Sequence, residues 1–203
     1  MGTRRSIFRL IALPCAVALA GAGASTPEVL PTDYWKDSAG FFERQAQVSL
    51  AGVSEMLARH PPATVASPER RMALVMLDQV LHDEAAPRRL SVQNFFQAQV
   101  KRALEEIKAT RVERGAVVWK FYDHAFVVRT ATVTLAFDLT RAGSSGVDAF
   151  MMTPEMMREL VGQCDVLFVS HVHRDHADEE VAALFLEQGK PVVAPPTVWL
   201  GKG

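Results

Sequence analysis

Residues 164–176 read Cys-Asp-Val-Leu-Phe-Val-Ser-His-Val-His-Arg-Asp-His, and this stretch decides the fold. Its first half is a short apolar run containing Val and Phe, which predicts a buried strand. Its second half carries three imidazoles and a carboxylate, the ligand types that Zn²⁺ and similar divalent cations prefer. His171 and His173 are two residues apart, so they point to the same side of an extended chain. Asp175 and His176 follow at the turn and approach from another direction. The stretch therefore predicts a metal-binding loop, and the alternative is an ordinary exposed polar loop.

The residues after this loop predict a helix. Residues 177–188 have acidic side chains in their first turn, where the helix dipole favours negative charge. Val181, Leu184 and Phe185 are spaced to face a core, and Gly189 is expected to end the helix. The sequence thus predicts a strand, then the metal-binding loop, then a helix, so the loop follows directly on the end of a buried strand.

The residues before the loop predict further strands and a helix. Residues 117–130 form apolar runs on either side of the turn Asp123-His124-Ala125, and residues 131–138 form the next run, which ends at Asp138. A loop over residues 141–146 follows, and then Thr153-Pro154 predicts the start of a helix that extends to residue 162.

The motif His171-Val-His173-Arg-Asp175-His176 at a strand end resembles the signature of the metallo-β-lactamase fold hydrolases. The Asp123-His124-Ala125 turn is similar to one in the ascorbate-phosphate lactonase-like branch, and Asp138 matches an acidic residue that supports the metal loop. The resemblance covers about residues 115–200. It implies an α/β fold in which an N-terminal helical region precedes the first half of an αββα sandwich.

The resemblance also implies a chemistry, the hydrolysis of an ester, lactone, amide or phosphodiester by metal-activated water. His171 and His173 would bind one metal, and Asp175 and His176 a second. Asp175 would also orient the nucleophile. Asp138 would hydrogen-bond a ligand imidazole and fix its tautomer, and His124 would lie near the site. Zn²⁺ is the expected cofactor, as one or two ions, with Mn²⁺ or Fe²⁺ as alternatives.

The sequence departs from the family in the ligands that usually follow the first motif. The family takes a third His, a bridging Asp and a last His from later loops, whereas residues 177–203 contain no His, and their single Asp, Asp178, falls within the predicted helix. We therefore expect a truncated or fragmentary member with an incomplete site. The alternative to a hydrolase is a non-catalytic metal-binding or interaction protein that a second copy or another chain completes, or a truncated product without a function of its own.

The N-terminal residues predict export. Arg4, Arg5 and Arg9 precede an apolar run over residues 10–20 and then small residues up to Ser25, which is typical of a secretory signal peptide. We expect a periplasmic or secreted protein with no membrane segment after cleavage. Removing three arginines and no acidic residue changes the formal charge from −1 to −4, and this excludes an electrostatic case for nucleic-acid binding. The expected partner is a small-molecule substrate.

The expected domains are a signal peptide over residues 1–25, a helical region over 26–114 and the partial hydrolase domain over 115–203. Helices are predicted over Asp33–Arg59, from Pro68 to about His82, and over Val92–Thr110 with Ser91 as its cap. Cys164 precedes the buried strand and is expected to be packed rather than reactive. No motif in the helices decides their role.

Overall fold

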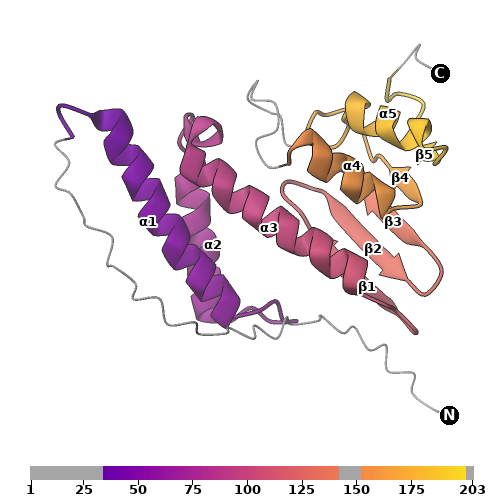
Figure 1. Ribbon diagram of the computed structural model, residues 1–203, viewed down its shortest axis with the longest axis horizontal. Coiled ribbons are helices and arrows are strands. Elements are labelled where there is room, and N and C mark those ends of the chain that lie inside the picture. The colour runs from indigo at the N-terminus through magenta and orange to yellow at the C-terminus, as the bar shows by residue number, and fades with distance from the viewer. Residues whose placement is uncertain (1–33, 142–151, 200–203) are drawn as a thin grey trace. The chain divides into compact units, whose positions relative to one another are not determined.

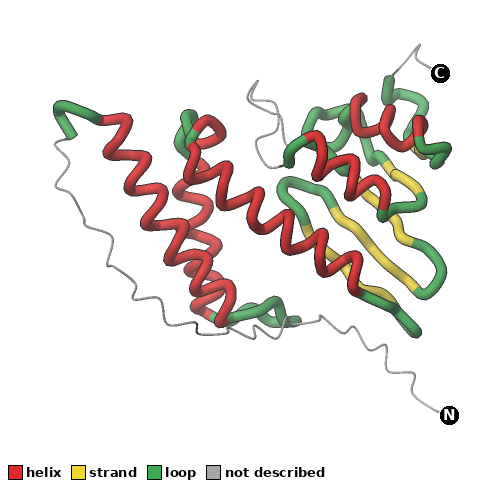
Figure 2. Tube along the Cα trace, viewed as in Figure 1, coloured by secondary structure: helices red, strands yellow, loops and turns green. Residues whose placement is uncertain are grey.

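The protein is described here by a computed structural model of residues 34–141 and 152–199 (Figure 1). These residues have a mixed α/β structure with five α-helices and one mixed five-stranded sheet, which confirms the predicted fold class at this level (Figure 2). They divide into two compact units. One unit is residues 34–92, and the other is residues 93–141 together with 152–199. The predicted signal peptide and the predicted loop beyond residue 141 lie outside the described residues.

The first unit consists of α1 (Ser38–Arg59), α2 (Pro68–Leu81) and a short 3₁₀ helix, η1 (Ala86–Arg88). Helix α1 begins five residues later than the predicted start at Asp33. Its first turn is capped by Asp37, whose carboxylate accepts a hydrogen bond from the Gly40 N–H at 2.8 Å. Helix α2 begins as predicted, because Ser67 caps it and Pro68 occupies the first turn.

Helix α3 (Leu90–Ala109) begins before Ser91, so the prediction that Ser91 caps it is wrong. The Ser91 N–H instead donates to the Glu43 carboxylate at 2.8 Å, which satisfies a backbone donor of the first turn from another helix. The division between the two units falls within α3, after Val92. The domain boundary that the sequence places at residue 114 stays a prediction.

The sheet of the second unit has the strand order β1-β2-β3-β4-β5. Strands β1 (Ala116–Lys120), β2 (Phe126–Thr130) and β3 (Thr134–Phe137) form an antiparallel meander, and β4 (Val166–Phe168) and β5 (Val192–Val193) continue it in parallel with β3. Strands β2, β3 and β4 fall within predicted apolar runs, and β1 begins one residue before its run. The two parallel connections contain α4 (Pro154–Gly162) and α5 (Glu179–Glu187).

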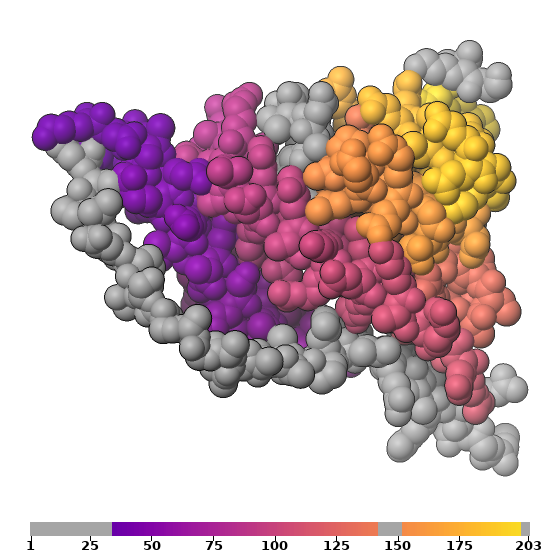
Figure 3. All heavy atoms as spheres, in the orientation of Figure 1, coloured from indigo at the N-terminus to yellow at the C-terminus, as the bar shows by residue number. Residues whose placement is uncertain are grey.

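Helices α3, α4 and α5 cover one face of this sheet (Figure 1). The two parallel connections place α4 and α5 on this same face (Figure 1), and their atoms adjoin in the space-filling view (Figure 3). The covered face contributes Trp119, Val127, Ala136 and Leu167 to the core, and the helices contribute buried apolar side chains such as Leu104, Leu160 and Phe185. Cys164 is only 1% exposed, as predicted.

The opposite face of the sheet presents two apolar rows that follow the strand register. One row pairs Val118, Val128, Leu135 and Val166, and the other pairs Phe126, Phe137, Phe168 and Val193. The rings of Phe137 and Phe168 stack with centroids 5.2 Å apart, whereas Val118 is 51% exposed and Val193 47%. This face is therefore only partly covered.

Within the described residues, no helix combines the length and apolar character that crossing a bilayer requires.

Candidate metal centre

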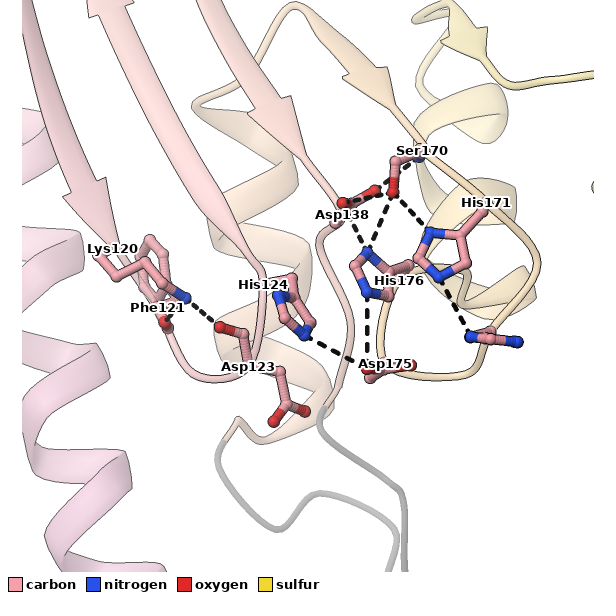
Figure 4. Close-up of polar contacts among 10 residues, drawn as sticks. Lys120, Phe121, Asp123, His124, Asp138, Ser170, His171, Asp175 and His176 are labelled. Atoms are coloured by element: carbon pink, nitrogen blue, oxygen red, sulfur yellow. Dashed lines mark hydrogen bonds and ion pairs between the residues drawn. The ribbon is translucent and has the colours of Figure 1, made fainter. Parts of the chain in front are cut away.

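The strand directions bring three separate segments to one edge of the sheet. Strands β3 and β4 are parallel, so their carboxyl ends lie together. Strand β2 runs antiparallel to β3, with Phe126 opposite Phe137, so the β1–β2 turn lies at the same edge. This edge therefore receives the β1–β2 turn, Asp138 after β3 and the histidine loop, residues 170–176, after β4 (Figure 4). Ligand sites of parallel sheets form at such carboxyl ends.

Asp138 organises the start of the histidine loop. Its carboxylate accepts hydrogen bonds from the Ser170 N–H at 2.7 Å and the Ser170 hydroxyl at 2.8 Å, and its Oδ2 lies 2.8 Å from His176 Nδ1. Burial opposes ionisation of this carboxyl, but the hydrogen bonds from His176 and Ser170 outweigh burial and lower its pKa. Asp138 also has a φ of 46°, in the left-handed region, which turns the chain sharply after β3.

The bond to Asp138 fixes the tautomer of His176. An ionised carboxylate only accepts hydrogen bonds, so Nδ1 must carry the hydrogen. The Nε2 atom then has a free lone pair, and it lies 3.5 Å from Asp175 Oδ2. A ligating imidazole requires this arrangement, with one nitrogen oriented by a carboxylate and the other available to a cation.

The histidine loop turns after His173, as the sequence predicted for Asp175 and His176. The N–H groups of His176 and Ala177 both donate to the His173 carbonyl, at 2.9 and 2.8 Å. His171 and His173 lie together, with Nε2 of the first 3.2 Å from Nδ1 of the second. The two predicted ligand pairs are neighbours, because the ring centroids of His171 and His176 are 3.8 Å apart.

His124 reaches the same cluster from the β1–β2 turn. Its ring stacks on His176 with centroids 4.2 Å apart, and its Nε2 lies 3.5 Å from Asp175 Oδ2. One ligand atom from each of His124, Asp175 and His176 falls within 4.8 Å of the other two. These three residues form a group that could hold a metal ion.

The β1–β2 turn is held by its own contacts. The Lys120 ammonium donates to the carbonyls of Phe121 and Asp123, and the Phe121 N–H donates to the Ala125 carbonyl at 3.0 Å. Asp123 has a φ of 51° and lies close enough to Asp175 that burial, together with the charge of Asp175, raises the pKa of Asp123. The turn thus presents His124 to the histidine loop while carrying a carboxyl that resists ionisation.

All six residues singled out in the sequence lie at this edge. Figure 4 shows His124, Asp138, His171, Asp175 and His176 there, and His173 lies beside them with its Nδ1 3.2 Å from His171 Nε2. The structure contains the expected hydrogen bond between Asp138 and a loop imidazole. Ser170 was missed, although its hydroxyl contacts Asp138 and lies 3.0 Å from Nδ1 of both His171 and His176. Its position directly before the first histidine was the available signal.

The donor set suits a divalent cation of borderline character. Imidazole nitrogens and carboxylate oxygens bind Zn²⁺, and the same set accepts Mn²⁺ or Fe²⁺. The residues present therefore fit the cofactor that the sequence resemblance implies.

A scan against protein-family models, a search of curated proteins and a search of solved structures each gave no match.

Proposed function

We propose that the histidine loop binds a divalent cation, with Zn²⁺ as the first candidate, and that the protein is a metal-dependent hydrolase of the metallo-β-lactamase type. The ascorbate-phosphate lactonase-like branch remains part of this proposal. The substrate would be a small ester, lactone, amide or phosphodiester. The observation that carries the proposal is the Asp138–His176 pair, in which a carboxylate orients an imidazole beside further ligand atoms.

Each residue of the cluster has a definite part in this proposal. Asp175 and His176 would hold this cation, and His171 and His173 would hold a second one where two ions bind. Asp175 would also orient the attacking water. Asp138 would keep the His176 Nε2 lone pair free. A bound divalent cation supplies Lewis acidity, which lowers the pKa of water and stabilises the charge that develops on a carbonyl or phosphoryl oxygen.

The test is hydrolysis of a panel of chromogenic esters, lactones and phosphodiesters by the purified full chain. Activity should disappear with a chelator, return with added Zn²⁺ or Mn²⁺, and be lost in His173→Ala. Hydrolysis that persists in the chelator and in His173→Ala would contradict the proposal.

The partly covered sheet face supports a second candidate, a metal-binding protein that a second copy or another chain completes. Val118 and Val193 are about half exposed on this face, in rows that also contain stacked phenylalanines. Apolar surface of this kind favours association. The variant Val118→Lys should weaken any concentration-dependent self-association in light scattering, whereas Glu113→Lys, outside the strands, should not. Equal association of Val118→Lys and the wild type would contradict this use of the face.

The N-terminal residues support the further proposal that the protein is exported to the periplasm or secreted. N-terminal sequencing of the mature protein should begin near Ser25. A mature protein that starts at residue 1 would contradict export through a cleaved signal peptide.

A further inference from the structure

Two imidazoles from different segments face the same carboxylate oxygen. His124 Nε2 and His176 Nε2 each lie 3.5 Å from Asp175 Oδ2 (Figure 4). One imidazole comes from the β1–β2 turn and the other from the histidine loop after β4. The sequence resemblance implies that Asp175 and His176 form a two-residue ligand pair, and it leaves His124 merely near the site.

These distances suit ligands that share one cation. An N–H···O hydrogen bond is about 2.7–3.2 Å long, so 3.5 Å is too long for a good one. Two ligand atoms about 2.05 Å from a tetrahedral Zn²⁺ are about 3.3 Å apart. Both measured distances lie within a few tenths of an ångström of that value, and all three ligand atoms lie within 4.8 Å of one another.

Both imidazoles are also held in place by contacts that need no cation. His176 is oriented by Asp138 through Nδ1, and its side chain is 13% exposed. His124 is fixed by the Lys120 contacts of its turn and by stacking on His176 with an interplanar angle of 13°. The Nε2 atoms of both rings therefore point to Asp175 before any ion binds.

We infer that His124, Asp175 and His176 together hold one divalent cation, with His124 as a third ligand supplied by the β1–β2 turn. This inference rests on the proposed function, since it assigns a further ligand to the same cation. Two imidazoles and one carboxylate on one ion leave coordination positions open for water and a substrate oxygen. The cation of Asp175 and His176 then has three ligands from the described residues instead of two.

The test uses the zinc affinity of the full chain, measured by competition with a chromophoric chelator. His124→Phe keeps a flat ring that can stack on His176 but has no ligand atom, so its affinity should fall at least tenfold, as it does when even an outer partner of a ligand is lost. His82→Phe is the matched control, because His82 also lies 3.5 Å from a carboxylate, that of Asp78, but does so at the end of α2. Its zinc affinity should equal that of the wild type.

A second measurement covers the case in which His124→Phe disturbs the fold. Long-range ¹H–¹⁵N spectra of the histidine side chains in the wild type, with and without Zn²⁺, should show a metal-induced shift at His124 Nε2. Wild-type affinity in His124→Phe, or an unshifted His124 nitrogen in the zinc-saturated protein, would overturn the inference. If His176→Ala then still abolished zinc binding, the proposed function would stand without it. A wild-type chain that binds no zinc would overturn both.

Discussion

Replacing Asp138 by asparagine changes the tautomer of a candidate ligand while leaving the shape of the site almost unaltered. The Asp138 carboxylate accepts the His176 Nδ1 hydrogen at 2.8 Å and two hydrogen bonds from Ser170. In Asp138→Asn, the new amide oxygen can still accept from the Ser170 N–H. The amide nitrogen, however, would face His176 Nδ1 as a donor, so the ring would place its hydrogen on Nε2. That hydrogen would occupy the lone pair needed by the cation.

The size of the effect follows from these contacts. Loss of a carboxylate that orients a ligating imidazole lowers metal affinity about 10–100-fold, which corresponds to about 1.4–2.8 kcal/mol. The free energy of unfolding should also fall by about 1.5–3 kcal/mol, because hydrogen bonds to an ionised carboxylate are lost.

Zinc competition and urea unfolding of Asp138→Asn measure the two effects. The matched control is Asp165→Asn, since Asp165 accepts the Thr134 N–H at 2.7 Å and joins the same two strands at their other end. The control should keep its zinc affinity within about twofold, a change small beside the 10–100-fold expected at Asp138. Equal zinc affinities for Asp138→Asn and the wild type would refute the assignment of Asp138 as the orienting residue.

Two further predictions concern the core. Arg129 donates to the Thr134 hydroxyl at 3.0 Å and to the carbonyls of Ile107, Thr110 and Gln163. Because Arg129→Met leaves these acceptors without their donor, it should lower the free energy of unfolding by at least about 2 kcal/mol. The control Arg158→Met removes an exposed ion pair with Glu155, so it should change the free energy of unfolding in urea by less than about 0.5 kcal/mol. Equal losses of stability in the two variants would contradict the role of Arg129. Burial raises the pKa of the Cys164 thiol from 9.0 to about 12, so above pH 9 the unfolded thiol ionises while the folded thiol stays protonated. Relative to Cys164→Ala, the wild type should therefore lose about 1.4 kcal/mol of stability per pH unit above pH 9 and nothing below it, and a stability difference that is the same at pH 8 and pH 10 would contradict this.

The parts of the fold that the sequence predicted well are those set by local chemistry. Helices α2 and α4 begin where a Ser or Thr cap precedes proline, and strands β2, β3 and β4 fall within the apolar runs. The start of α1 was misplaced because Asp33 and Asp37 are both good caps, and only the observed bond to Gly40 distinguishes them. Ser91 looked like a cap, but a carboxylate from α1 takes its N–H, which is a tertiary contact.

In the candidate site, too, some features follow from the local sequence and others depend on tertiary contacts. The histidine loop could be found from the sequence because its ligands are neighbours in the chain. The place of His124 near the site was expected only from the resemblance, because it depends on the register of β2 against β3, which brings the β1–β2 turn to the edge where β4 ends. Ser170 was missed because its position before the first histidine does not by itself show that its hydroxyl contacts Asp138.

The zinc content of the purified full chain tests the central claim most directly. After dialysis against metal-free buffer and addition of Zn²⁺, elemental analysis should find at least about one tightly held zinc ion per chain, as expected for a site with three or more ligands. The same measurement on the variant with His171, His173 and His176 all replaced by alanine should find almost none. Zinc bound equally by the variant and the wild type, or by neither, would contradict a metal centre in the histidine loop.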